Sequence, residues 1–354
     1  MLQGNHSMVK EFALLGLSQA QGTQFFLFFL FLLFYCLILP GNILIIMTIC
    51  NDTRLGSPMY FFLANLAFLD ICYCSVTPPK MLADFFSSRK AISYKACMAQ
   101  IFFLHLLGGS EVFLLIAMAI DRYVAICHPL HYATIVSRSV CSAMVVGSWC
   151  LGFVHSTIQV FLIVPLPFCG PNELDNFFCD VTQLVKLACA DTNALEFFMF
   201  VNSGVSTFIS FILFIISYVI LLFKVRTGSV EGKNKATSTC ITHIIIVIVM
   251  FGPAIYIYCH PFREFSFDKV VAVFHTMVFP LMNPIIYTLR NKEIKHAIRR
   301  LLTRGHLSCE EKKIVFASHL RFSRVCLHAN DKYLQGCRLE DGASFFPPPL
   351  VGRT

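Results

Sequence analysis

Long apolar runs alternate with short polar connections along this chain of 354 residues. A run of about 20 apolar residues is long enough to cross the hydrocarbon core of a bilayer as a helix. Seven such runs are present, at residues 25–50, 58–80, 97–122, 140–164, 196–223, 237–259 and 270–289. The pattern predicts an all-α membrane protein, built as a seven-transmembrane helix bundle.

The segment after the last run has a different period. Between residues 291 and 302, Ile294, Ala297, Ile298 and Leu301 fall on one helical face, and lysines and arginines take the other. A basic amphipathic helix binds the surface of anionic lipid. We therefore predict a short amphipathic cytoplasmic helix over 291–302 that contacts membrane lipids.

The remaining residues, 303–354, show neither a repeat nor a sustained period. A segment without hydrophobic periodicity has no face to bury against a core. We predict an atypical, largely disordered cytoplasmic tail.

Composition excludes a soluble domain, because 56% of the residues are hydrophobic and only 14% are charged, against about 25% in soluble proteins. The net charge of +8 does not indicate a nucleic-acid partner, since the basic residues gather at particular ends of the spans. None of the 16 cysteines forms a CxxC pair, so we expect no structural zinc site. No cofactor is expected either.

Lys and Arg distribution predicts the orientation of the bundle. The connections after the first, third, fifth and seventh spans carry an excess of basic residues, whereas the others mix both signs. The positive-inside rule makes the basic connections cytoplasmic. Residues 1–24 then form an extracellular N-terminus before the receptor domain at 25–290. The glycosylation acceptor Asn5-His6-Ser7 fits this orientation.

Charged residues stand at the inner end of the third span, in Met118-Ala119-Ile120-Asp121-Arg122-Tyr123-Val124-Ala125-Ile126-Cys127. Charges at membrane depth cost a few kcal/mol or more and usually serve function. A switch that faces the cytoplasm would need charges at this place. The alternative is an arginine that merely extends to the interface.

Further polar groups lie deeper. Asp70 is in the second span and Glu111 in the third, eleven residues before Arg122. With Asn283 they suggest a sodium or proton site, and the alternative is a pair of protonated structural acids. A protease that uses Asp70 and Asp121 is excluded, because the two acids lie at different depths.

Two further features of the spans accompany these acids, the side-chain amide of Asn42 and the proline Pro284. The buried amide of Asn42 can be satisfied only by a hydrogen bond between helices. Pro284 frees a backbone carbonyl in the seventh span and permits a kink.

Two more runs complete the pattern: Lys235-Ala236-Thr237-Ser238-Thr239-Cys240-Ile241-Thr242-His243, and Pro280-Leu281-Met282-Asn283-Pro284-Ile285-Ile286-Tyr287-Thr288-Leu289-Arg290-Asn291-Lys292. With the third-span motif and Ser217-Tyr218, they resemble the olfactory (odorant) receptor family of G-protein-coupled receptors, in its tetrapod-type (class II) branch. The resemblance covers roughly residues 5 to 303.

The resemblance implies a switch in which Asp121 holds Arg122 at rest and releases it to the G protein on activation. The residues implied in this switch and in coupling are Asp121, Arg122, Tyr123, Tyr218, Lys235, Thr239, His243 and Tyr287. Four cysteines on the outer side allow three disulfide pairings. The resemblance implies Cys97–Cys179 and Cys169–Cys189.

A ligand site follows from counting helical turns outward from Arg122 and taking comparable heights on other spans. The candidates are Leu104, His105, Gly108, Val112, Asn202, Ser206, Phe251, Ile255, Tyr258 and Thr276. An apolar cavity with few polar groups suits a small volatile molecule. The alternative for each residue is ordinary packing between helices.

The expected function is that of an odorant receptor, not an enzyme. It would bind small volatile molecules in the outer half of the bundle and activate a heterotrimeric stimulatory olfactory G protein, raising cyclic AMP. The expected location is the plasma membrane, with trafficking chaperones as further partners. The alternative is the same mechanism with a non-odorant small molecule in a non-olfactory tissue. A transporter is disfavoured, since no repeat of interrupted helices is present.

Overall fold

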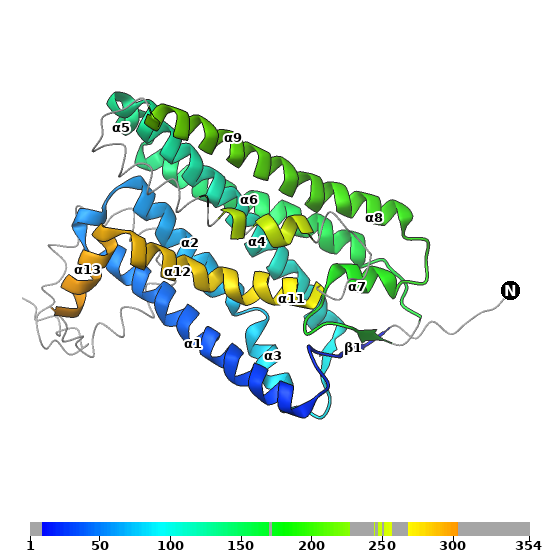
Figure 1. The fold of residues 1–354 in the computed structure, drawn as a ribbon. Coiled ribbons are helices and arrows are strands. Elements are labelled where there is room, and N and C mark those ends of the chain that lie inside the picture. Colours follow the sequence, from blue (N-terminus) through cyan, green and yellow to red (C-terminus); the bar gives the residue numbers. More distant parts are fainter. Residues whose placement is uncertain are drawn as a thin grey trace, which may run out of the picture. The chain divides into compact units, whose positions relative to one another are not determined.

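The computed structural model describes residues 9–169, 172–226, 244, 247–249, 251–256 and 268–303. Helices that run side by side dominate this part of the chain (Figure 1). The strands are β1 (Glu11–Leu14), β2 (Ala91–Ser93) and β3 (Glu173–Leu174). The helices and helical turns are α1 (Gln21–Asn51), η1 (Thr53–Leu55), α2 (Pro58–Cys74), α3 (Pro78–Asp84), α4 (Tyr94–Cys127), η2 (Pro129–His131), α5 (Tyr132–Ile135), α6 (Arg138–Ile163), α7 (Val181–Lys186), α8 (Asn193–Met199), η3 (Phe200–Val205), α9 (Ser206–Arg226), α11 (Asp268–Val273), η4 (Phe274–Val278), α12 (Phe279–Arg290) and α13 (Lys292–Thr303).

Six described helical segments are long and apolar enough to cross a membrane. They correspond to the first five predicted spans and to the seventh. The predicted span at 237–259 lies mostly outside the described residues, and an apolar helix at Val247–Tyr256 represents it. The chain is thus a multi-pass membrane protein with the helical bundle expected from its apolar pattern.

Proline positions explain two irregularities in the spans. The second span breaks after Cys74 and resumes as α3, whose first two residues are Pro78 and Pro79. Proline is favoured at the start of a helix, because the first N–H groups have no helical partner. In α12, Pro284 leaves the carbonyl of Pro280 without its helical donor.

The Asn42 side chain supplies the missing donor. Its Nδ2 lies 3.3 Å from Pro280 O and 3.1 Å from Ile38 O, so the buried amide bridges α1 and α12. Gly41 allows this approach, because a Cβ there would lie 3.1 Å from the Pro284 Cβ. The expected interhelical hydrogen bond is therefore present, and it satisfies the carbonyl that the proline frees.

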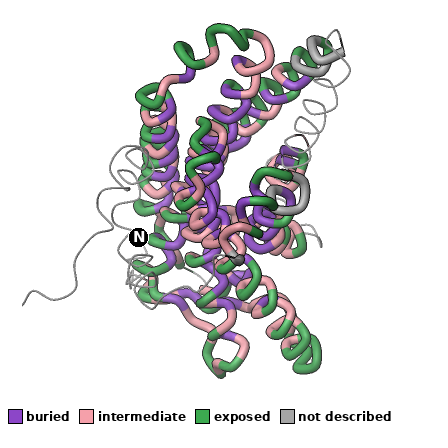
Figure 2. The backbone as a smooth tube through the Cα atoms, turned by 90° about the vertical axis from the view of Figure 1, so that its left-hand side faces the viewer, coloured by how far each residue is buried: buried purple, intermediate pink, exposed green. Residues whose placement is uncertain are grey.

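Burial is greatest in the middle of the bundle. The most apolar part of α2–α3 is 61% buried, whereas that of α1 is 22% buried. Figure 2 shows buried positions along the helix faces that meet inside and exposed positions on the outer faces. The exposed faces of α1, α6 and α9 carry many large apolar side chains, as helices in contact with lipid require.

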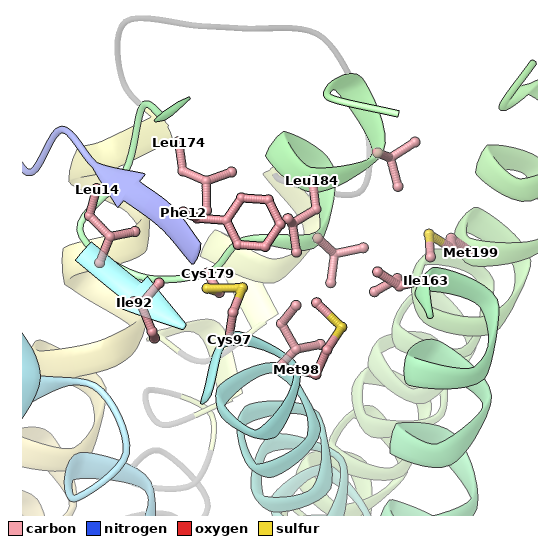
Figure 3. Packing of buried hydrophobic residues seen from close by; sticks show 13 residues of the cluster. Phe12, Leu14, Ile92, Cys97, Met98, Ile163, Leu174, Cys179, Leu184 and Met199 are labelled. Carbon is pink, nitrogen blue, oxygen red and sulfur yellow. A yellow bond between two sulfur atoms is a disulfide. The ribbon is translucent and has the colours of Figure 1, made fainter. Parts of the chain in front are cut away.

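A small sheet covers one end of the bundle, which we call the cap end. Strand β1 pairs antiparallel with β2 and parallel with β3. Phe12 on β1 is fully buried and belongs to a cluster with the Cys97–Cys179 disulfide and Leu184 (Figure 3). No strand was expected in residues 1–24, and the structure places β1 there.

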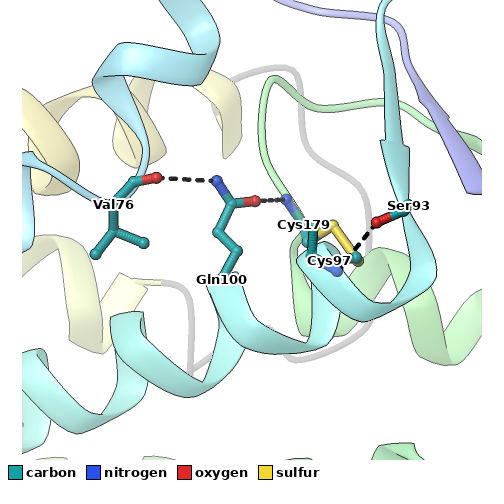
Figure 4. The surroundings of a disulfide bond; sticks show 6 residues. Val76, Ser93, Cys97, Gln100 and Cys179 are labelled. Carbon is teal, nitrogen blue, oxygen red and sulfur yellow. Dashed lines mark hydrogen bonds between the residues drawn. A yellow bond between two sulfur atoms is a disulfide. The ribbon is translucent and has the colours of Figure 1, made fainter.

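Both disulfides implied by the resemblance are present, Cys97–Cys179 and Cys169–Cys189. Beside the first, Gln100 accepts a hydrogen bond from Cys179 N at 2.9 Å and directs its Nε2 to Val76 O at 3.4 Å (Figure 4). The disulfide and this side chain fasten the loop before α7 to the first turns of α4. This loop in turn helps to close the cap end.

The opposite end, here called the α13 end, carries the amphipathic helix expected over 291–302. Asn291 caps α13, since its Oδ1 accepts from the N–H groups of Glu293 and Ile294 at 3.0 and 3.2 Å. Ile294 and Ala297 are buried. The tail at 303–354 lies outside the described residues apart from Thr303.

Candidate functional site

A cavity of about 380 Å³ opens between the helices toward the cap end. Its volume falls in the range of small-molecule sites, roughly 300–1,000 Å³. Eight of the ten candidate ligand residues line it: Leu104, His105, Gly108, Val112, Asn202, Ser206, Phe251 and Thr276. Four of these residues, on α4, came from helical counting along the third span, and the other four came from comparable heights on other spans.

Two candidates are placed differently. Ala254 and Tyr256 line the cavity, whereas Ile255 between them does not. Successive residues on a helix point about 100° apart, so an error of one position moves a side chain off the wall. Tyr258 lies outside the described residues.

Three aromatic polar residues of the wall were not expected. The Tyr73 hydroxyl lies 2.8 Å from His275 Nδ1, joining α2 to η4. His155 on α6 faces His105 on α4, with ring centroids 5.7 Å apart. These three residues line the same cavity as the predicted ones, and their polar character on otherwise apolar spans is the signal that could have indicated them.

Asp180 brings a carboxyl group to the cap side of the cavity. It follows Cys179 in the chain, so the disulfide to α4 positions it, and Thr182 donates a hydrogen bond to it. Burial raises the pKa of Asp180, while the Thr182 hydrogen bond and the nearby His105 oppose this rise. The position of the outer cysteines is the signal that could have indicated this residue.

The three residues predicted to form a sodium or proton site, Asp70, Glu111 and Asn283, lie together in the middle of the bundle. Asn283 Nδ2 donates to Asp70 Oδ1 at 3.1 Å and to Oδ2 at 2.9 Å. Glu111 lies beside Asp70, and both side chains are buried. Two carboxyl groups can share a hydrogen bond only when one carries a proton. Geometry alone is compatible with both the proton site and the structural acid pair.

The third-span motif lies toward the α13 end. Asp121 is buried, and its Oδ1 accepts a hydrogen bond from the Tyr132 hydroxyl at 2.6 Å. Among the described residues, Asp121 forms no ion pair with Arg122, and Arg122 Nε and Nη2 have no hydrogen-bond partner. Tyr132 thus occupies the carboxylate that the sequence assigned to Arg122. Burial and the neighbouring carboxylate raise the pKa of Tyr132.

Of the other predicted switch residues, the structure describes the surroundings of Tyr123 and Tyr218. Tyr123 lies against His128, with ring centroids 6.2 Å apart. Tyr218 is buried on α9 and stacks on Phe214 at 6.3 Å. Lys235, Thr239, His243 and the acceptor Asn5 lie outside the described residues, and of Tyr287 only the helical backbone is described.

Comparisons with known proteins agree on one family. Residues 31–305 match the profile of the family described as olfactory receptor. Olfactory receptor 4M1 of Homo sapiens is 59% identical over 314 residues, which are 88% of this chain and 100% of that protein. The Mus musculus protein of the same name matches equally, also at 59%. Olfactory receptor 4N4 of Homo sapiens is 55% identical over 311 residues, 88% of this chain and 98% of that protein.

Proposed function

The chain belongs to the olfactory receptor family of G-protein-coupled receptors, and from this premise we propose that it binds small volatile molecules in the cap-end cavity and activates a stimulatory olfactory-type G protein. Activation raises cyclic AMP. The protein acts in the plasma membrane, with the cap end extracellular and α13 cytoplasmic. Family membership identifies a receptor and not an enzyme.

The observation that carries the ligand site is the cavity itself. Its volume of about 380 Å³ suits a molecule of few heavy atoms, and its walls combine apolar side chains with a small number of polar groups. Lining residues come from α4, α6, η3, α9, the described part of 251–256 and η4. A ligand there contacts most of the helices that have to move relative to one another during activation.

The α13 end supports the coupling role. Among the described residues, Arg122 makes no ion pair with its neighbour Asp121, and Tyr132 donates a hydrogen bond to Asp121 Oδ1. An arginine in this arrangement is available to a partner protein that approaches between α4 and α9. Asp70 and Asn283 are hydrogen-bonded to each other in the middle of the bundle, and Glu111 lies beside Asp70.

A cavity-filling variant tests the ligand site. Gly108 lines the cavity, and a Cβ there makes only ordinary contact with Tyr73 at 3.7 Å, so Gly108→Leu extends into the open space. Cyclic AMP responses to an odorant library should fall at least tenfold in potency. Gly252→Leu is the control, because Gly252 is exposed and a Cβ there meets nothing within 4 Å.

Both variants are compared at equal surface level, and cells lacking the stimulatory G protein provide the coupling control. A Gly108→Leu receptor with unchanged odorant potency would place the ligand elsewhere. A cyclic AMP response that persists without the stimulatory G protein would refute the coupling assignment.

A further inference from the structure

Asp180 is a partly buried acidic residue of the cavity wall that forms no ion pair with a basic side chain among the described residues. Asp175, on the same wall, differs, because its Oδ1 lies 2.6 Å from Lys269 Nζ. Lys186 also lines the cavity, and neither it nor Lys269 contributes to the electrostatic environment of the Asp180 carboxyl group. The wall therefore holds a carboxyl group whose charge is not balanced by a lysine or arginine in the described structure.

The carboxyl group of Asp180 is held in place but keeps acceptor sites for a ligand. The preceding residue, Cys179, is joined to α4 by the disulfide to Cys97, which fixes the backbone. The Thr182 hydroxyl donates to Asp180 Oδ2. An ionised carboxylate can accept about four hydrogen bonds, so this contact leaves most of its acceptor sites open. A donor group of a bound molecule can therefore reach a preorganised acceptor.

Aromatic side chains line the same cavity. Tyr73, Phe178, Phe251 and Tyr256 come from four different segments of the chain. The face of an aromatic ring attracts a cation, most strongly where water is excluded. His105, which lies near Asp180, is inside a transmembrane span, where the neutral imidazole is favoured over the charged one. The wall thus combines one unbalanced carboxyl group with aromatic and apolar surface.

We propose that this cavity binds small volatile amines, with the ammonium group at Asp180 and the hydrocarbon body against the apolar and aromatic part of the wall. The inference rests on the proposed function and specifies its ligand class. Aliphatic amines are protonated at neutral pH, since a lysine amine has a pKa of about 10.4. A positive charge beside a carboxyl group favours its ionised form, and a hydrogen bond between two charged groups is stronger than one between neutral groups. An alcohol of the same skeleton offers one neutral donor at this place.

Matched ligand sets test the proposal in the full-length receptor with a cyclic AMP reporter. Each aliphatic amine is compared with the alcohol and the hydrocarbon of the same skeleton. In wild type the amine should be roughly ten- to hundredfold more potent than the alcohol, as a hydrogen bond to a charged group predicts.

Asp180→Asn keeps the size of the side chain and an acceptor for Thr182, and it should abolish the preference while the alcohols keep their potency. Asp180→Ala is a second uncharged variant with the same expected loss of preference. Glu173→Gln is the control, because it removes the same charge from an exposed position in the same loop and should leave the preference unchanged.

Surface labelling separates a folding defect from a loss of selectivity, and the ratio of potencies within one variant does not depend on its expression. Amines that are no more potent than the alcohols in wild type would overturn the inference and leave the receptor assignment intact. A preference that survives both Asp180 variants, or that Glu173→Gln removes equally, would also overturn the inference. Absence of any response from surface-delivered wild type to the amines, alcohols and a broad odorant library would contradict the proposed function, and the ligand class with it.

Discussion

Replacing Gly152 by alanine creates a steric conflict where α4 crosses α6. A Cβ at this position would lie 2.6 Å from Leu106 O and 2.7 Å from Ser110 N. Both are backbone atoms, so no side-chain rotation relieves the overlap. Ordinary contacts are about 3.5 Å, and the helices would have to separate by roughly 0.8–0.9 Å. Small residues let transmembrane helices approach closely, and here the approach is at its limit.

The cost can be set against a matched control on the same helix. Overpacking typically costs about 1–3 kcal/mol. Gly147→Ala also adds a methyl group to α6, but a Cβ there meets nothing within 4 Å. Both variants gain the same helix propensity, about 1 kcal/mol. Their difference in stability therefore isolates the conflict, at about 1–3 kcal/mol.

Thermal unfolding in detergent measures this difference. The buried free cysteines Cys74 and Cys141 react with a thiol-sensitive dye as the bundle opens. At about 2–4 °C per kcal/mol, the Tm of Gly152→Ala should be roughly 2–12 °C below that of Gly147→Ala. Equal Tm values for the two variants would refute the close approach of α4 and α6.

Three further predictions concern the ends of the bundle. Tyr132→Phe frees the Asp121 carboxylate to engage the neighbouring arginine, so odorant potency should fall tenfold or more, since a hydrogen bond to a charged group contributes about 1.5–3 kcal/mol. Asp52→Asn removes the ion pair with Arg300, whose Nε lies 3.0 Å from Asp52 Oδ2, and should speed hydrogen exchange in α13. Phe12→Ala should destabilise the cap by about 3–5 kcal/mol and reduce surface delivery.

The Asp52 ion pair also predicts a pH dependence. Burial is the largest single influence on Asp52 and opposes its ionisation. The hydrogen bonds from Arg300 and from the Arg54 backbone N–H, with the charges of the two arginines, together outweigh burial and lower the pKa of the carboxyl group. A lowered folded-state pKa gives stability that is present at neutral pH and is lost as the pH falls through that pKa. The difference in stability between wild type and Asp52→Asn should therefore begin to shrink near about pH 4, the ordinary pKa of an Asp, and disappear only below the lowered pKa of folded Asp52.

Each of these predictions has an outcome that contradicts it. Unchanged potency in Tyr132→Phe would mean that the hydrogen bond to Asp121 does not govern coupling. Equal exchange in α13 with and without Asp52 would remove its role as an anchor. Phe161, which is 77% exposed, is the control for Phe12, and an equal loss of delivery in Phe161→Ala would show a general effect.

The spans were predictable because a bilayer imposes both their length and their apolar character. A hydrogen bond from Asn42 to another helix was predictable, because a buried amide needs a partner. The identity of that partner, the carbonyl of Pro280, was not, because it depends on how α1 packs against α12. The cavity-lining residues on α4 were predictable from the helical period of the third span. The ring positions of His155 and His275 were not predictable, because they depend on how the neighbouring helices are rotated about their axes.

The sheet at the cap end could not be predicted from the sequence, for a different reason. Strand β1 has four residues, too few for a clear alternation, and its partners β2 and β3 lie far away in the chain. Its buried residues, Phe12 and Leu14, lie in a short apolar run, residues 12–15, that has no polar alternation. Tyr132 was likewise missed as the partner of Asp121, because the contact depends on the path of the connection between α4 and α6.

The central claim is that ligand binding at the cap end drives G-protein activation through Arg122 at the other end. Its most direct test is odorant-dependent cyclic AMP in cells that express wild type or Arg122→Ala at equal surface level. We expect a response in wild type and its loss in the variant. An undiminished, ligand-dependent signal from Arg122→Ala would contradict the account.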